Sequence, residues 1–232
     1  IEVCDWSSDV CSSDLVASAT FRDNESAYLA GVAAANTTKT NKVGFIGGVE
    51  GPVIGRFQAD FEKGVADAGK KLGKDIQITS TYAGTFADAS KGRALASSMY
   101  QAGADIIYHA AATTGQGIFQ EAKALNETGS KDKVWVIGVD RDQNEDGKYT
   151  TKDGKDDNLT LASTIKGVNI AVKKISDLAL EDKFPGGEHL TYGLKDGGVD
   201  LTTEALSDQA KTAVKEAKEQ IISGDVKVPD QP

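Results

Sequence analysis

Apolar residues recur along the chain with two different spacings. Short runs rich in β-branched and other apolar residues predict strands at 43–46, 76–82, 104–108, 134–139, 159–165 and 190–194. Between these runs, apolar residues return every three or four positions, which predicts helices at 24–35, 57–72, 88–102, 118–125, 167–180 and 203–221. Strands that alternate regularly with helices are typical of an α/β fold with a parallel sheet.

The helix expected at 57–72 shows how clear this spacing is. Its apolar residues follow one another at intervals of 4, 4, 3 and 4, which places them on one face of the helix; they are Phe57, Phe61, Val65, Ala68 and Leu72. The continuous apolar run at 134–139 has no such periodicity and is expected at the centre of the sheet, buried on both faces.

The segment 141–158 interrupts the alternation with charged and turn-forming residues, so we expect a protruding loop or hairpin there. Part of it matches the D-x-[DN]-x-[DN]-G pattern of a calcium loop, with Asp in place of the final Glu. The candidate Ca²⁺ ligands are Asp142, Asn144, Asp146 and Asp153. An ordinary hairpin is the alternative, because such loops are often rich in Asp, Asn and Gly, and three nearby lysines would weaken cation binding.

Composition excludes several classes of protein. The 232 residues carry 26 Lys and Arg against 35 Asp and Glu, and the formal net charge of -9 has the wrong sign for binding a phosphate backbone. The proportions of apolar and charged residues are those of a globular protein, and no apolar run approaches the length of a membrane-spanning helix. Nucleic acid is therefore not an expected partner.

The first fifteen residues, IEVCDWSSDVCSSDL, differ from the rest of the chain. They contain both cysteines, four acidic residues, no basic residue and the near-repeat SSDV/SSDL. They resemble the peptide obtained by translating a sequencing adapter, so we interpret 1–15 as an artefactual tail. The alternative is a genuine tail closed by a disulfide between Cys4 and Cys11. The other 217 residues have no cysteine and a net charge of -5, which suits an oxidising compartment.

Common catalytic signatures are absent from the sequence, so we do not expect an enzyme. There is no G-x-S-x-G, G-x-x-x-x-G-K-[ST], H-E-x-x-H or C-x-x-C motif. Glu50, in the turn before the helix at 57–72, argues against a phosphate loop there, since a carboxylate would repel the anion. His109 either lines a cleft or is a structural histidine of the core.

Aromatic and polar residues follow the predicted strands, where an open α/β sheet places its ligand cleft. Tyr108, the turn at 110–115 and Asp140 all lie at expected carboxyl ends. Tyr108 could stack on a flat ring and Asp140 could hold a hydroxylated sugar. The alternatives are an aromatic at the edge of the core for Tyr108 and a helix cap or turn residue for Asp140.

Several ordered segments resemble the basic membrane protein family of bacterial ABC-transporter substrate-binding lipoproteins, and within it the purine-nucleoside receptors. They are FRDNESAYLAGVAAA (21–35), VGFIGGVEGPVIGRFQADFEKGV (43–65), YAGTFADASKGRALASSMYQAGADIIYHAA (82–111), VIGVDRDQ (136–143), LTLASTIKGV (159–168) and YGLKDGGVDL (192–201). The resemblance implies a type I periplasmic-binding-protein fold, flavodoxin-like, in which two three-layer lobes close on a purine nucleoside. The nucleoside would then pass to ABC permease subunits at the extracytoplasmic face of the bacterial plasma membrane.

The same resemblance implies roles for four residues. Tyr108 would stack on the base, Asp140 and Lys166 would hold the ribose hydroxyls, and Gly115 would contribute its backbone. A carboxylate beside an ammonium is chemically suited to bind a diol through charge-assisted hydrogen bonds. A sugar receptor, a cytoplasmic regulator or an enzyme on the same fold are the alternatives, because fold alone does not fix function.

Members of this family begin with a signal peptide, a lipobox cysteine that carries the lipid anchor and most of the first lobe, and none of these precedes Phe21 in this sequence. We therefore expect a second ligand-binding lobe at 21–158, a hinge crossing with partial first-lobe elements at 159–200, and a C-terminal helix and tail at 201–232. The helix at 167–180 should lack much of its packing partner. With half of the cleft missing, nucleoside binding should be weak or undetectable.

Overall fold

The computed structural model describes residues 14–129 and 132–229. The interpretation of 1–15 as an artefactual tail, including the alternative disulfide, falls on residues outside the described part except for Asp14 and Leu15. In chain order the elements are β1 (Ser18–Phe21), α1 (Asp23–Thr37), β2 (Lys42–Gly47), α2 (Pro52–Leu72), β3 (Gln77–Tyr82), α3 (Ala89–Gln101), β4 (Ile106–Ala110), α4 (Thr114–Thr128), β5 (Trp135–Gly138), η1 (Glu145–Gly147), β6 (Lys148–Thr150), β7 (Asp156–Asn158), β8 (Thr160–Lys166), α5 (Val168–Leu180), β9 (His189–Tyr192), η2 (Leu194–Asp196), β10 (Val199–Leu201) and α6 (Asp208–Ser223).

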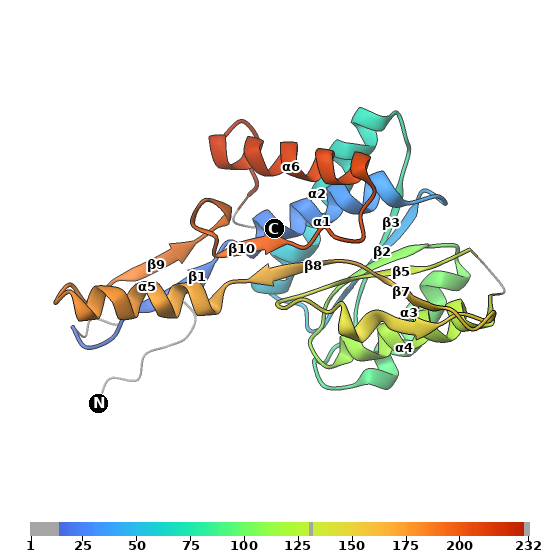
Figure 1. Cartoon of the computed structure of the whole chain (residues 1–232), viewed down its shortest axis with the longest axis horizontal. Helices are drawn as coiled ribbons and strands as arrows, with labels where there is room; N and C mark the ends of the chain where they lie inside the picture. Colours follow the sequence, from blue (N-terminus) through green and yellow to red (C-terminus); the bar gives the residue numbers. More distant parts are fainter. Residues whose placement is uncertain (1–13, 130–131, 230–232) are drawn as a thin grey trace.

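A six-stranded sheet forms the middle layer, in the order β10-β8-β5-β4-β2-β3. Neighbouring strands from β8 to β3 are parallel, and only the short edge strand β10 runs antiparallel, next to β8. Helices α1, α2 and α6 cover one face of this sheet, and α3 and α4 cover the other (Figure 1). The predicted α/β fold with a parallel sheet in a three-layer sandwich is confirmed.

Helix α1 is the most deeply buried of the three helices α1, α2 and α6 that cover one face of the sheet. Every residue from Asn24 to Ala35 is buried, because the helix is covered by the sheet, α2 and α6. Its small side chains allow α2 to approach very closely: a Cβ placed on Gly31 would lie 2.3 Å from the Phe61 carbonyl oxygen, and one on Gly64 would lie 2.2 Å from the Tyr28 carbonyl oxygen. The two helices therefore pack backbone against backbone at this crossing.

The face of the sheet covered by α3 and α4 contains a buried histidine. His109 is fully buried in β4, and its ring meets Phe119 edge-on at 5.9 Å between centroids. Among the described residues, neither ring nitrogen has a hydrogen-bond partner. Burial lowers the pKa of His109 from 6.5 to about 4, with Gln143, Asp140 and Asp146 opposing part of that shift. The imidazole is thus neutral at pH 7.

Two predicted boundaries differ from the structure for local reasons. The strand expected at 104–108 is β4 at 106–110, because Asp105 lies in the preceding turn, where it accepts hydrogen bonds from the Thr38 hydroxyl at 2.7 Å and the Lys39 backbone N–H at 2.7 Å. The last helix begins at Asp208 rather than near 203, since the Ser207 side chain caps it by accepting from the backbone N–H of the third helical residue.

The segments after residue 158 divide between the main sheet and a projecting part. Strand β8 pairs with β5 inside the main sheet, and α6 packs on α1, so both belong to the same lobe as 21–158. Helix α5 and the two-stranded β1-β9 ribbon instead project to one side of this lobe (Figure 1). In α5, Val168, Val172 and Leu180 are 51%, 58% and 85% exposed, and only Ala171 is buried.

The crossing of α1 and α2 predicts a large cost for an added methyl group. Gly31→Ala or Gly64→Ala should destabilise the protein by about 1–3 kcal/mol, because backbone atoms of the facing helix cannot move aside as a flexible side chain would. Urea unfolding measures this loss. Gly51→Ala is the matched control, since a Cβ there meets no atom within 4 Å and φ is 169°, an extended value. Wild-type stability of both helix variants would contradict the close packing.

The buried His109 predicts a specific sensitivity to acid. Its folded-state pKa lies below the unfolded value, so the unfolded chain binds the extra proton, and stability present above pH 6.5 is lost as the pH falls toward 4. At about 1.4 kcal/mol per pKa unit, the difference is worth about 3 kcal/mol. His109→Leu should flatten the unfolding free energy across this range. Exposed His189, changed to Gln, serves as the control, and an unchanged slope in His109→Leu would contradict the assignment.

Candidate functional site

Five parallel strands end at the same edge of the main sheet. Because β3, β2, β4, β5 and β8 run in one direction, their carboxyl ends and the loops that follow them lie together. We name this the carboxyl edge, defined by Gly48, Phe86, Thr113, Asp140 and Lys166, which lie at or just beyond those ends. It is where a ligand of this type of sheet would lie.

Lys166, the last residue of β8, forms an ion pair with two carboxylates at this edge. Its Nζ lies 3.2 Å from Asp23 Oδ2 and 3.3 Å from Asp140 Oδ1. The Lys166 backbone N–H also donates to the Asp140 carbonyl at 2.9 Å, which fixes the two residues side by side. Burial disfavours the charged ammonium, but the two carboxylates outweigh this effect and raise the pKa of Lys166. The lysine is charged at neutral pH.

Asp140 is the exposed member of this cluster. Its side chain is 55% exposed, whereas that of Lys166 is 27% exposed and that of Asp23 only 13%. Its backbone is left-handed, with φ of 67°, so the chain turns sharply directly after β5. Asp140 and Lys166, predicted as the diol-binding pair, are therefore in contact, and the Asp140 carboxylate is exposed enough to accept hydrogen bonds from a ligand.

The structure does not give Tyr108 the role predicted for it. Since β4 extends to Ala110, Tyr108 lies in the middle of the strand and not at its end. Its ring is fully buried, 5.2 Å from Phe61, 5.7 Å from Phe45 and 6.5 Å from Phe57 between centroids, and its hydroxyl lies 3.2 Å from Thr164 Oγ1. No ring face is open to a base, so Tyr108 is a core residue in this structure.

Phe86 is the half-exposed aromatic residue at the carboxyl edge that the sequence reasoning missed. Its ring is 40% exposed and lies against Gly48, where a Cβ would approach the ring within 2.1 Å. Its carbonyl accepts from the Thr114 backbone N–H at 3.1 Å, which ties the loop to the start of α4. One sequence feature could have identified Phe86 as a candidate site residue. It is an aromatic residue in a turn-forming segment, AGTFAD, directly after the strand predicted at 76–82.

Gly115, predicted to offer its backbone to a ligand, lies in the first turn of α4 beneath this edge. A Cβ there would lie 2.2 Å from His109 Cε1, so the absent side chain makes room for the buried imidazole. The Gly115 backbone N–H donates to the Ala112 carbonyl at 3.0 Å. In this arrangement the N–H is used within the turn, and the glycine contributes by its lack of a side chain.

A pocket of about 360 Å³ opens beside Asp140, between the loops that follow β4 and β5. Its lining includes His109, Thr113, Gln116, Asp140, Arg141 and Gln143. Arg141 is held by Asp146 at 2.7 Å, and the Gln143 side chain donates to the same carboxylate at 2.9 Å. The pocket is therefore polar but nearly balanced in charge, which favours an uncharged, hydroxylated group over an anion.

The predicted calcium loop folds as a short 3₁₀ turn followed by the β6-β7 hairpin. Each of its four candidate ligands interacts with a group of the protein: Asp142 accepts from the Asn144 backbone N–H, Asn144 accepts from the Asn158 side chain, Asp146 binds Arg141, and Asp153 pairs with Lys155. Within the described residues, no group of three or more His, Cys, Asp or Glu side chains is placed to hold a metal ion. The geometry thus favours the alternative, an ordinary hairpin.

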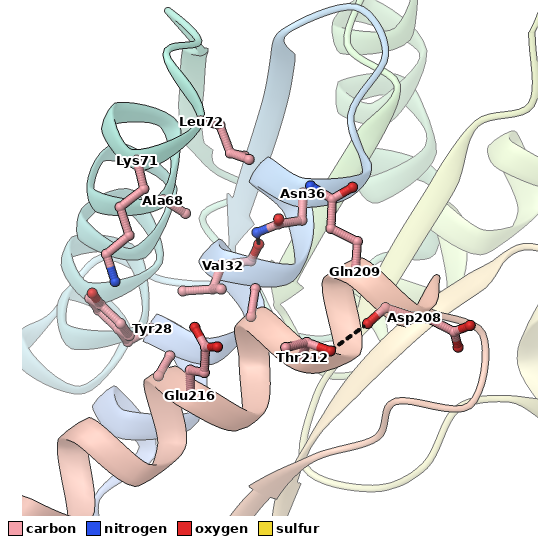
Figure 2. Close-up of a pocket in the computed structure, with 12 residues that line it drawn as sticks. Tyr28, Val32, Asn36, Ala68, Lys71, Leu72, Asp208, Gln209, Thr212 and Glu216 are labelled. Carbon is pink, nitrogen blue, oxygen red and sulfur yellow. Dashed lines mark hydrogen bonds between the residues drawn. The ribbon is translucent and has the colours of Figure 1, made fainter.

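A second hollow, of about 490 Å³, lies away from the carboxyl edge, between α1, α2 and α6 (Figure 2). Its lining mixes apolar residues such as Val32 and Leu72 with Tyr28, whose hydroxyl donates to Asp67 at 2.9 Å. No strand-end residue contributes to it.

In the part of the chain that the structure describes, no helix is long and apolar enough to cross a membrane.

Comparison with known proteins identifies the family. The profile described as "Bmp: ABC transporter substrate-binding protein PnrA-like" matches residues 7–232. The chain is 54% identical over 217 residues to the ABC transporter nucleoside-binding protein BmpA of Lactococcus lactis subsp. cremoris, covering 93% of this chain and 61% of that protein. It is 49% identical over 221 residues to the CD4+ T-cell-stimulating antigen of Listeria monocytogenes serovar 1/2a, covering 94% and 61%.

Among solved structures, the chain resembles an ABC transporter solute-binding protein from Aeropyrum pernix K1, with a TM-score of 0.77 and 27% identity. The similarity covers 93% of this chain and 67% of that structure. The chain spans 61% of the length of the two curated relatives named above. The family resemblance seen in the sequence is confirmed, and the chain belongs to the Bmp family of PnrA-like ABC transporter substrate-binding proteins.

Proposed function

We propose that this chain contributes one face of a nucleoside-binding cleft in the substrate-binding component of an ABC importer. The carboxyl edge is that face, and the ligand is a purine nucleoside. Asp140 and Lys166 bind the sugar hydroxyls, and Phe86 packs on the base. The bound nucleoside is then delivered to permease subunits at the extracytoplasmic face of the membrane, where a lipid anchor holds the whole protein.

The contact between Lys166 and Asp140 at the carboxyl edge, where Phe86 is also exposed, is the observation that carries this proposal. An ammonium and a carboxylate 3.3 Å apart offer donors and an acceptor to neighbouring hydroxyls, and such charge-assisted hydrogen bonds are stronger than neutral ones. Phe86 supplies an aromatic face, and stacking suits a planar heterocycle. The Lactococcus lactis relative is named a nucleoside-binding protein, which supports the same ligand class.

A sugar-binding receptor is the alternative that this edge also accommodates, because the ion pair would bind the hydroxyls of a free sugar equally well. Only the base distinguishes the two ligands, so the contribution of Phe86 separates them. A regulator or an enzyme on the same fold has no support from particular residues of this chain, and fold likeness alone does not favour either.

Titration of the isotope-labelled chain with inosine tests the proposed function. Inosine should shift the NMR signals of Phe86, Asp140 and Lys166, with weak affinity. Lys166→Met should lower that affinity about tenfold or more, because a hydrogen bond to a charged group is worth about 1.5–3 kcal/mol. Lys173→Met, which removes an exposed lysine paired with Asp177 on α5, is the matched control and should bind as the wild type does.

Two results would count against this function. NMR titration detects even millimolar affinity, so one result is that inosine leaves all signals at the carboxyl edge unchanged up to millimolar concentration. The other is that Lys166→Met binds inosine as tightly as the unaltered chain. Shifts confined to other parts of the molecule would have the same meaning.

Phe86→Ala separates a nucleoside from a sugar. Loss of base stacking should weaken inosine binding by roughly 5- to 150-fold, since stacking on an aromatic residue is worth on the order of 1–3 kcal/mol. Binding of methyl β-D-ribofuranoside, which has no base, should be unaffected in the same titration. Phe184→Ala, at a ring that is 41% exposed elsewhere, is the control. Equal weakening of both ligands would instead indicate a damaged edge.

A further inference from the structure

Asp23 stands out at the carboxyl edge because no motif in the sequence pointed to it. It is the first residue of α1, directly after the ribbon strand β1, and more than 140 positions separate it from Lys166. The fold nevertheless places its Oδ2 3.2 Å from Lys166 Nζ. Its side chain is only 13% exposed, which makes it the most buried of the three charged groups.

The charges that face Asp23 come from three other elements. Lys166 lies at the end of β8, Asp140 in the loop after β5, and Arg56 in α2. Burial raises the pKa of Asp23, Lys166 and Arg56 oppose that rise, and Asp140 adds to it. Two carboxylates therefore share one ammonium, with Asp23 beneath it and Asp140 open to solvent.

The difference in burial between Asp23 and Asp140 matters because the lysine side chain that they share is flexible. Its four-carbon stem has about 2 kcal/mol of rotamer entropy, so an ammonium held by a single partner is poorly fixed. Without Asp23, the only carboxylate of the described residues paired with Lys166 would be Asp140, the same group that is to accept hydrogen bonds from the ligand. The ring of Phe57, with its centroid 5.9 Å from Nζ, contributes a further but weaker contact.

We propose that Asp23 is a positioning residue of the sugar-binding site, which holds the Lys166 ammonium from the buried side so that Lys166 and Asp140 both face the ligand's hydroxyls. The inference rests on the proposed function and deepens it. Asp23 itself touches no ligand. Its effect is confined to the sugar hydroxyls, because Phe86, which packs on the base, is not in contact with this ion pair.

The test compares two ligands and three variants by NMR titration of the full chain. Inosine carries the 2′- and 3′-hydroxyls of the ribose, and 2′,3′-dideoxyinosine lacks both of them. Asp23→Asn should lower inosine affinity about tenfold and leave dideoxyinosine affinity unchanged, so the ratio of the two affinities falls. Asp23→Glu, which keeps the charge on a longer stem, should restore part of that ratio. Asp177→Asn removes a carboxylate from an exposed ion pair in α5 and should change neither affinity.

The outcomes separate this inference from the proposed function. If the unaltered chain binds neither ligand, the proposed function fails and the inference with it. If the unaltered chain prefers inosine and Asp23→Asn keeps that preference, or weakens both ligands equally, only the inference is overturned. Should Asp23→Asn not fold, Asp23→Glu decides: a reduced but measurable preference for inosine supports the positioning role, and an unchanged preference overturns it.

Discussion

The burial of α1 is the constraint on which the rest of this structure depends. The helix is enclosed by the sheet, α2 and α6, and its contact with α2 is so close that Gly31 and Gly64 leave no room for a methyl group. A helix fixed in this way also fixes its first residue, Asp23, at the carboxyl edge. Asp23 meets Lys166, and Lys166 meets Asp140. Core packing and the candidate site are thus linked through one short chain of contacts.

Periodicity alone was sufficient to predict most of this fold. Strands β2, β3, β5 and β8 and all six helices lie close to where the spacing of apolar residues placed them. Each of these elements except α5 buries one face or both. Strands β1 and β10 were not predicted. They have four and three residues, too few to show alternation, and their pairing partners β9 and β8 are distant along the chain. Such short strands are defined by tertiary contacts rather than by local pattern.

The candidate site was predictable only in part, for reasons that differ between residues. Asp140 follows a predicted strand, so the rule that ligands lie at carboxyl ends located it, whereas Lys166 was implied only by the family resemblance. Tyr108 was misplaced because the strand extends two residues further than the pattern indicated, and this shift moves an aromatic ring from the edge into the core. The pairing of Asp23 with Lys166 depends on a contact between remote segments, which no spacing rule predicts.

The central claim is that the carboxyl edge binds a nucleoside with its sugar on Asp140 and Lys166 and its base on Phe86. Intermolecular NOEs between inosine and the labelled chain test this orientation most directly. The account predicts contacts from the ribose protons to the Lys166 side chain and from the base protons to the Phe86 ring. Contacts from the base protons to Lys166 and from the ribose protons to Phe86 would contradict it. So would contacts only with residues of the hollow between α1, α2 and α6.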